Sequence, residues 1–318
     1  MANNIRVAFF GSPPFALPTL EALIDSGKHP SVIVTAPSKR SGRGRRVADN
    51  LIAELGKNNG IPVLQPESIN DSLFQEELKG YGCDLMCVVS YGKILSEKLI
   101  KLTRLGCVNI HASLLPRWRG ASPIQASILS GDLKSGITIQ KMVLELDAGD
   151  VLHSKELLLP AGTTSPWLFK KLSVMGAESF LEFFEKVEET NVLPAGKPQS
   201  SLDITYCQKI QKHDGKINWQ QRSDVVYKHY CAYLGWPGAF SYLPNGERLT
   251  IHEAKLLLRD EDLGSPGEIF LSDKKEVLVA CSSGALELIW VQREGRKKTK
   301  ASDLVGSSVV KAGDHLGS

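Results

Sequence analysis

Short apolar runs alternate with amphipathic segments over residues 1–189. Continuous apolar runs of this length predict buried strands, and apolar residues spaced three and four apart predict helices. Buried strands separated by helices are typical of a parallel sheet covered on both faces, so the pattern predicts a doubly wound, Rossmann-like α/β domain. The expected strands are 5–10, 31–35, 61–64, 84–89, 108–110 and 137–143, and the expected helices are 15–24, 48–58, 122–129 and 164–187.

The pattern changes after residues 190–205, which are rich in Pro, Gly and Ser. Such a segment indicates a linker. Beyond it, a helix at 223–234 is followed by short β-like runs, which are typical of a small OB-like β-barrel. The prediction is therefore a first domain at 1–189, a linker at 190–205 and a second domain at 206–318. Its expected strands are 239–243, 249–258, 268–271, 277–281 and 286–291, and residues 311–318 are expected to be frayed.

The composition is that of an ordinary globular protein. The 318 residues are 42% hydrophobic and 23% charged, and the formal net charge of +3 is too small to indicate a nucleic-acid binder by itself. No signal-peptide core follows the N-terminus, and no run approaches the roughly 18 apolar residues that span a bilayer. A cytoplasmic protein is therefore expected. Six cysteines without paired zinc-ligand spacing predict buried free thiols and no metal site.

Three polar residues follow expected strands: Asn109 and His111 at the end of 108–110, and Asp147 after 137–143. Ligands bind at the carboxyl ends of the strands in an open parallel sheet, and alternation places Asn109 and His111 on one face. An Asn amide can donate to the oxygen of a tetrahedral intermediate, and a His moves protons near neutral pH. An Asp beside the His would orient it and favour its protonated form. Each residue type is more often structural than catalytic, so these residues alone predict only an acid–base cleft.

Residues 109–120, NIHASLLPRWRG, resemble the signature of the folate-dependent formyltransferases. Residues 146–150, LDAGD, look like the second signature of that family, although Glu145 and Ala148 stand where Gly and Thr are usual. The resemblance implies 10-formyltetrahydrofolate as co-substrate, no metal, and an attacking amine in place of a nucleophilic side chain. The catalytic residues that it implies are Asn109, His111 and Asp147. The residues that it implies contact the reduced folate are Ser113, Leu114, Leu115 and Pro116.

Three further segments, 7–23, 88–95 and 204–219, resemble the branch of this family that formylates methionyl-tRNA, and the resemblance extends over about residues 5–305. It implies that the acceptor is the amino group of initiator methionyl-tRNA, so that the protein supports translation initiation; a monomer is expected. Other acceptors stay open: glycinamide ribonucleotide, a nucleotide amino sugar, or water in a hydrolase. A tRNA-binding module with an inactive transferase fold is a further alternative, which the presence of all three catalytic residue types disfavours.

A basic segment, SKRSGRGRR at 38–46, follows the second expected strand and contains no acidic residue. Most charge runs are solvated surfaces, but a basic loop on this side of the sheet can contact the phosphates of a tRNA. The tRNA-formylating branch has an inserted loop at this place that contacts the acceptor stem, and this segment is similar to it. The residues expected to bind tRNA are Lys39, Arg40, Arg43, Arg45 and Arg46. The second domain is expected to help position the tRNA, and Trp219 and Trp236 are expected to pack within it.

Overall fold

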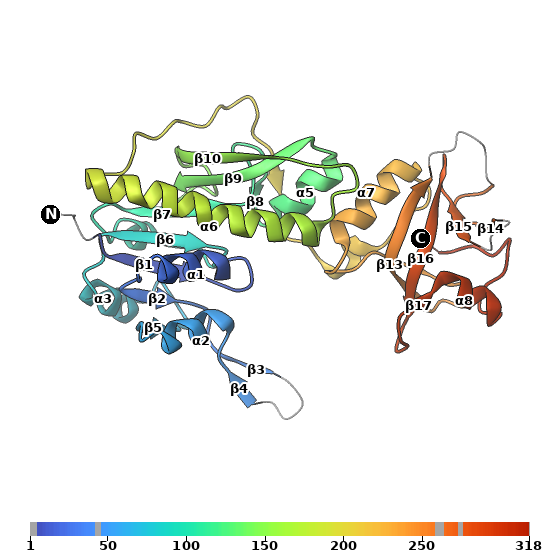
Figure 1. Cartoon of the computed structure of the whole chain (residues 1–318), viewed down its shortest axis with the longest axis horizontal. Coiled ribbons are helices and arrows are strands. Elements are labelled where there is room, and N and C mark those ends of the chain that lie inside the picture. Colours follow the sequence, from blue (N-terminus) through green and yellow to red (C-terminus); the bar gives the residue numbers. More distant parts are fainter. Residues whose placement is uncertain (1–4, 42–45, 258–263, 273–275, 318) are drawn as a thin grey trace. The chain divides into compact units, whose positions relative to one another are not determined.

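The computed structural model describes residues 5–41, 46–257, 264–272 and 276–317 (Figure 1). The chain forms two compact units. The first comprises Met1–Pro123, Lys134–Leu158 and Phe169–Cys207, and the second comprises Ile124–Leu133, Leu159–Leu168 and Gln208–Ser318. The first unit therefore contains all the residues predicted to be catalytic or to contact folate.

A seven-stranded sheet forms the centre of the first unit, in the order β10-β9-β7-β6-β1-β2-β5. Its parallel strands are β1 (Val7–Gly11), β2 (Val32–Val34), β5 (Val63–Leu64), β6 (Leu85–Val89) and β7 (Cys107–His111). The antiparallel strands are β9 (Lys134–Lys141) and β10 (Val151–Leu158). The predicted parallel sheet is confirmed. The direction of β9 and the presence of β10 were not predicted, because an apolar run carries no sign of its direction and β10 is only half-buried.

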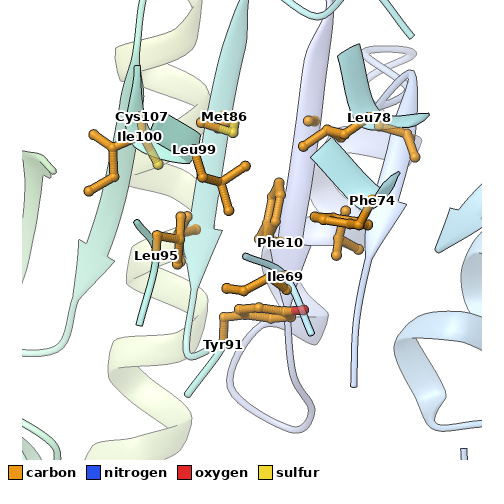
Figure 2. Packing of buried hydrophobic residues seen from close by; sticks show 14 residues of the cluster. Phe10, Ile69, Phe74, Leu78, Met86, Tyr91, Leu95, Leu99, Ile100 and Cys107 are labelled. Carbon is orange, nitrogen blue, oxygen red and sulfur yellow. The ribbon is translucent and has the colours of Figure 1, made fainter. Parts of the chain in front are cut away.

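One face of this sheet is covered by α3 (Ser72–Gly80) and the short helix α4 (Glu97–Ile100). Phe74 and Leu78 of α3 and Leu99 of α4 pack with Phe10 of β1 and Met86 of β6 in one apolar cluster, which Figure 2 shows. Burial of such side chains is the main favourable contribution to folding. The strands near the predicted site are therefore held from this side by a continuous core.

The opposite face is covered by α1 (Leu17–Asp25), α2 (Leu51–Asn58) and α6 (Ser165–Thr190), the long helix that runs along the sheet in Figure 1. Gly56 of α2 lies against Ile33 of β2, and Gly176 of α6 lies against Ile110 of β7 and Ile137 of β9. A Cβ on Gly56 would come within 2.7 Å of Ile33, so glycine permits this close approach. Helices on both faces confirm the doubly wound arrangement.

Helix α2 begins later than the predicted residue 48. The Asn50 side chain accepts hydrogen bonds from the backbone N–H groups of Ile52 and Ala53, which fixes the helix start after Asn50. The residues before it form a hairpin of β3 (Lys39–Ser41) and β4 (Arg46–Ala48).

The segment predicted as a linker belongs to the first unit and bonds to the rest of that unit at several points. Lys197 forms an antiparallel bridge with Val151, and the Thr205 oxygen accepts from Arg119 N–H. Directly after the segment, β11 (Tyr206–Cys207) pairs with β8 (Arg119–Gly120). Backbone hydrogen bonds make these contacts, so the polar, turn-rich sequence gives no apolar signal of them. The domain boundaries stay a prediction.

An antiparallel sheet forms the centre of the second unit, in the order β12-β13-β16-β15-β14, with β17 paired to β16. This confirms the predicted small β domain; β17 and α8 were not predicted. The strands are β12 (Phe240–Tyr242), β13 (Arg248–Leu257), β14 (Ile269–Leu271), β15 (Val277–Ala280), β16 (Ala285–Arg293) and β17 (Thr299–Lys300). The helices are α5 (Pro123–Ser130), the 3-10 turn η1 (Lys212–Gly215), α7 (Ser223–Tyr233) and α8 (Ala301–Gly306).

The C-terminal tail pairs with this sheet, so the prediction that it frays is wrong. Gly317 exchanges two backbone hydrogen bonds with Tyr242 of β12. Leu316 N–H donates to Gly267 O, and Ile269 N–H of β14 donates to Asp314 O. The tail thereby pairs with β12 and with the segment at the start of β14, so it covers part of both edges of the sheet.

Trp219 and Trp236, the two tryptophans predicted to pack within this unit, differ in burial. Trp219 is 1% exposed, and its indole N–H donates to Ser241 Oγ at 2.9 Å. This confirms the prediction for Trp219. Trp236 is 56% exposed, so its predicted packing role is wrong. The six cysteines are free thiols, four of them buried and two, Cys83 and Cys207, partly buried.

Candidate active site

Strands β7 and β9 present a row of polar side chains on the face opposite α6. Ile110 packs toward α6, so alternation along β7 directs Asn109 and His111 to the other face. In the antiparallel register, Asn109 lies opposite Gln140 and His111 lies opposite Thr138. The Asn109 amide makes no hydrogen bond to any residue that the structure describes. The site therefore contains an amide donor beside an imidazole, both fixed on a central strand.

The orientation of the His111 ring is set by one hydrogen bond. His111 is 6% exposed, and its Nε2 lies 2.8 Å from the backbone oxygen of Trp118. A carbonyl oxygen only accepts hydrogen bonds, so Nε2 carries the proton and donates it. Nδ1 is then the ring nitrogen that can gain a proton, and it lies 3.7 Å from Asp147 Oδ2. This distance is longer than a hydrogen bond but within the range of an ion pair, which forms only while the ring is protonated.

Asp147 reaches His111 by a different route from the one that the sequence suggests. Because β9 runs antiparallel to β7, its carboxyl end lies at Val108, away from the carboxyl end of β7. Residues 142–150 then fold back toward the site. Gly149 makes this possible, because a Cβ there would lie 1.6 Å from the Lys141 oxygen. The predicted proximity of Asp147 and His111 is therefore seen, but the strand-end argument for Asp147 was wrong.

The Asp147 carboxylate is held by two neutral donors. Gly120 N–H donates to Oδ2 and Gln140 Nε2 donates to Oδ1, each at 2.8 Å. The backbone of Asp147 has φ +51°, in the left-handed region that is uncommon for residues other than glycine. Together the two donors hold both oxygens of the carboxylate.

A clasp of three side chains holds the backbone of the same loop. Gln199 Nε2 donates to the backbone oxygens of Asp147 and Gly149, at 2.8 and 2.7 Å. Arg119 is 4% exposed; it donates from Nε to Gln199 Oε1 and pairs through Nη1 with Glu145 at 3.1 Å. Glu145, which stands where the family signature has Gly, is thus the acidic partner of Arg119 in the first signature.

The Cys207 thiol lies next to this clasp. Ser122 N–H donates to its sulfur at 3.3 Å. Burial raises the pKa of the Cys207 thiol, and the charge of Asp147 raises it further. The thiol is therefore a neutral neighbour of the carboxylate at physiological pH.

Two residues of the segment predicted to contact folate, Ser113 and Leu115, form hydrogen bonds with other residues of the first unit. Ser113 Oγ donates to the Arg117 oxygen at 2.6 Å, and the Ser113 oxygen accepts from Thr138 Oγ1 at 2.7 Å. Leu115 N–H donates to Thr138 Oγ1 at 3.0 Å. These bonds fix the segment beside His111, while Leu114, Leu115 and Pro116 keep part of their surface accessible. Their contact with folate stays a prediction.

The residues predicted to bind tRNA are described only in part. Arg43 and Arg45 lie outside the described residues. The backbones of Lys39 and Arg40 belong to β3 and that of Arg46 to β4. Their role in binding tRNA stays a prediction.

Sequence reasoning missed Thr138, Gln140 and Gln199. Thr138 and Gln140 are polar residues that alternate with Ile137 and Ile139 in β9, a signal that was available. Gln199 gave no signal, because it lies in the turn-rich segment and meets Asp147 only in the folded chain. Among the residues that the structure describes, no group of three His, Cys, Asp or Glu could hold a metal. No described helix is long and apolar enough to cross a bilayer.

Comparison with known proteins extends over nearly the whole chain. The family model described as formyl transferase matches residues 4–182, and the model described as formyl transferase, C-terminal domain, matches residues 209–308. A protein of Coxiella burnetii named methionyl-tRNA formyltransferase is 38% identical over 304 residues, which are 96% of this chain and 96% of that protein. A protein of Methylococcus capsulatus with the same name is 37% identical over 98% of this chain and 100% of its own length.

Solved structures share the fold at low sequence identity. HypX from Aquifex aeolicus in complex with tetrahydrofolic acid has a TM-score of 0.65 at 18% identity, over 97% of this chain and 48% of HypX. This chain thus spans about half the length of HypX. An N-formyltransferase from Helicobacter canadensis, in complex with folinic acid and dTDP-3-aminofucose, has a TM-score of 0.65 at 15% identity. That alignment covers 91% of this chain and 99% of the other.

Proposed function

This chain belongs to the formyl transferase family, and from that premise we propose that it transfers the formyl group of 10-formyltetrahydrofolate to the amino group of initiator methionyl-tRNA. The observation that carries the acceptor is the full-length similarity to proteins named methionyl-tRNA formyltransferase. The observation that supports the chemistry is the grouping of Asn109, His111 and Asp147 within the first unit.

Asn109 would donate a hydrogen bond to the formyl oxygen. Charge develops on that oxygen as the amine attacks, so a fixed amide donor stabilises the transition state more than the ground state. The partly buried Asn109 amide has no partner among the described residues, so binding this oxygen would break no internal bond.

His111 would move the proton of the reaction through Nδ1. The attacking amine loses a proton and the leaving nitrogen of the folate gains one, so a single ring nitrogen can accept and return it. Nε2 is held by the Trp118 oxygen, which keeps the ring in place during transfer. Asp147, 3.7 Å from Nδ1, would stabilise the positive charge while His111 carries the proton.

The remaining roles follow from the sequence. Ser113, Leu114, Leu115 and Pro116 would contact the folate beside His111, while Lys39, Arg40, Arg43, Arg45 and Arg46 would contact tRNA phosphates. The protein would act in the cytoplasm as a monomer, without a metal.

The test is to incubate the purified protein with 10-formyltetrahydrofolate and one acceptor at a time. The acceptors are initiator methionyl-tRNA, elongator methionyl-tRNA, glycinamide ribonucleotide, a nucleotide amino sugar and buffer alone. Formylation of initiator methionyl-tRNA well above all others supports the proposal. Preferential formylation of a small amine, or release of formate in buffer alone, contradicts it.

A further inference from the structure

Gln140 lies on β9 beside the carboxylate of Asp147, and the proposed function does not use it. Its side chain is 2% exposed, and its Nε2 donates to Asp147 Oδ1 at 2.8 Å. Its Oε1 has no hydrogen-bond partner among the residues that the structure describes. A buried acceptor without a partner costs folding free energy. This cost points to a role for Gln140 other than stability.

The two oxygens of the Asp147 carboxylate are held differently. Oδ2 accepts from Gly120 N–H and faces His111 Nδ1. In the described part of the chain, Oδ1 accepts a side-chain hydrogen bond from Gln140 alone. Two titratable groups interact with this carboxylate: His111 faces Oδ2, and the neutral Cys207 thiol has its pKa raised by burial and by the charge of Asp147.

We propose that Gln140 is a positioning residue for formyl transfer, which holds the Asp147 carboxylate turned so that Oδ2 faces His111 Nδ1. The inference rests on the proposed function, because Gln140 acts through a carboxylate assigned there. With both oxygens held, the carboxylate plane is fixed. Without the Gln140 donor, the plane can rotate about the Gly120 contact, and the position of Oδ2 opposite Nδ1 is lost.

The first test is Gln140→Met, which matches the length of Gln and removes its donor. We expect kcat to fall about tenfold, as for loss of one hydrogen bond to a charged group, with KM for both substrates unchanged within about twofold. A kcat equal to that of the parent overturns the proposal.

Gln140→Glu separates orientation from packing. Glu has the shape of Gln but presents a second carboxylate to Asp147, so kcat should fall further than in Gln140→Met. A fall in Gln140→Met with normal turnover in Gln140→Glu would mean that packing matters and the donor does not. The matched control is Gln75→Met on α3, another Gln that is 3% exposed and whose Oε1 has no partner within the described part of the chain; its kcat should equal that of the parent.

A double-mutant cycle with Asp147→Asn decides whether Gln140 acts through the carboxylate. In the Asp147→Asn background, Gln140→Met should lower the single-turnover rate by less than about twofold, because its target is gone. The same tenfold loss in both backgrounds would show a structural role and overturn the inference. Normal turnover of Asp147→Asn alone would instead refute the proposed site. An impaired Asp147→Asn beside a fully active Gln140→Met refutes this inference only.

Discussion

The two sides of the candidate site are built by different means. Strand β7, which carries Asn109 and His111, is covered by helices on one face and paired with β6 and β9 along both edges. The loop of residues 142–150, which carries Asp147, has exposed apolar side chains: Val143, Leu144 and Leu146 are 43%, 62% and 60% exposed. The strand is thus positioned by burial and the loop by hydrogen bonds.

This difference predicts how substitutions on each side of the site should affect turnover. The pleat fixes the direction of Asn109 and His111, so replacing either should remove chemistry without moving the strand. The position of Asp147 depends on Gly120, Gln140 and Gln199, so changes at residues that touch no substrate should also impair turnover. A hydrogen-bonded loop is less resistant to local opening than a buried strand.

The largest effect is expected on the strand side. His111→Ala should lower kcat about 10³-fold, because it removes the group that accepts and returns the proton. Its circular dichroism spectrum should match that of the parent, since the core face of β7 is unchanged. Steady-state formylation of methionyl-tRNA measures the effect; a loss smaller than about tenfold would contradict the role given to His111.

On the loop side, Gly149→Ala should lower kcat about 100-fold, the cost of a displacement of about 1 Å in a catalytic group. The added Cβ would meet the Lys141 oxygen at 1.6 Å, so residues 142–150 must move. Gly80→Ala is the matched control, because a Cβ at Gly80 meets nothing within 4 Å. Equal rates for the two variants would mean that the loop tolerates displacement.

Changes in the basic segment should affect neither side of the site. Neutralising Arg43, Arg45 and Arg46 together should raise KM for tRNA about tenfold and flatten its salt dependence, because fewer counterions are released. kcat and KM for folate should stay at parent values. A triple variant with an unchanged KM for tRNA would show that the segment is only solvated.

The smallest effect is expected from the clasp. Gln199→Met removes two donors to loop oxygens but leaves the carboxylate contacts, so kcat should fall about fivefold. Limited proteolysis should then cut within residues 142–150 faster than in the parent. Gln220→Met, at an exposed position of the second unit, is the control. Unchanged cleavage would contradict positioning of the loop by Gln199.

The sequence predicted the strand side better than the loop side, for a physical reason. A buried strand shows in the sequence as a run of apolar residues, so the run before His111 could be identified as a strand directly. Asp147 is contacted by residues distant in sequence, such as Gln199. The sequence of a turn does not show whether its polar side chains face solvent or form hydrogen bonds within the protein. The same reason explains the C-terminal tail, which pairs with Tyr242 through backbone groups that every residue carries.

The proposed reaction can be followed directly as single-turnover transfer of labelled formyl from 10-formyltetrahydrofolate to initiator methionyl-tRNA, by the parent and by His111→Ala. We expect the label to be recovered as formylmethionine with the parent, and the rate to be about 10³-fold lower with the variant at equal folate binding. Label that stays in folate or appears as formate with the parent, or equal rates for the two proteins, would contradict this expectation.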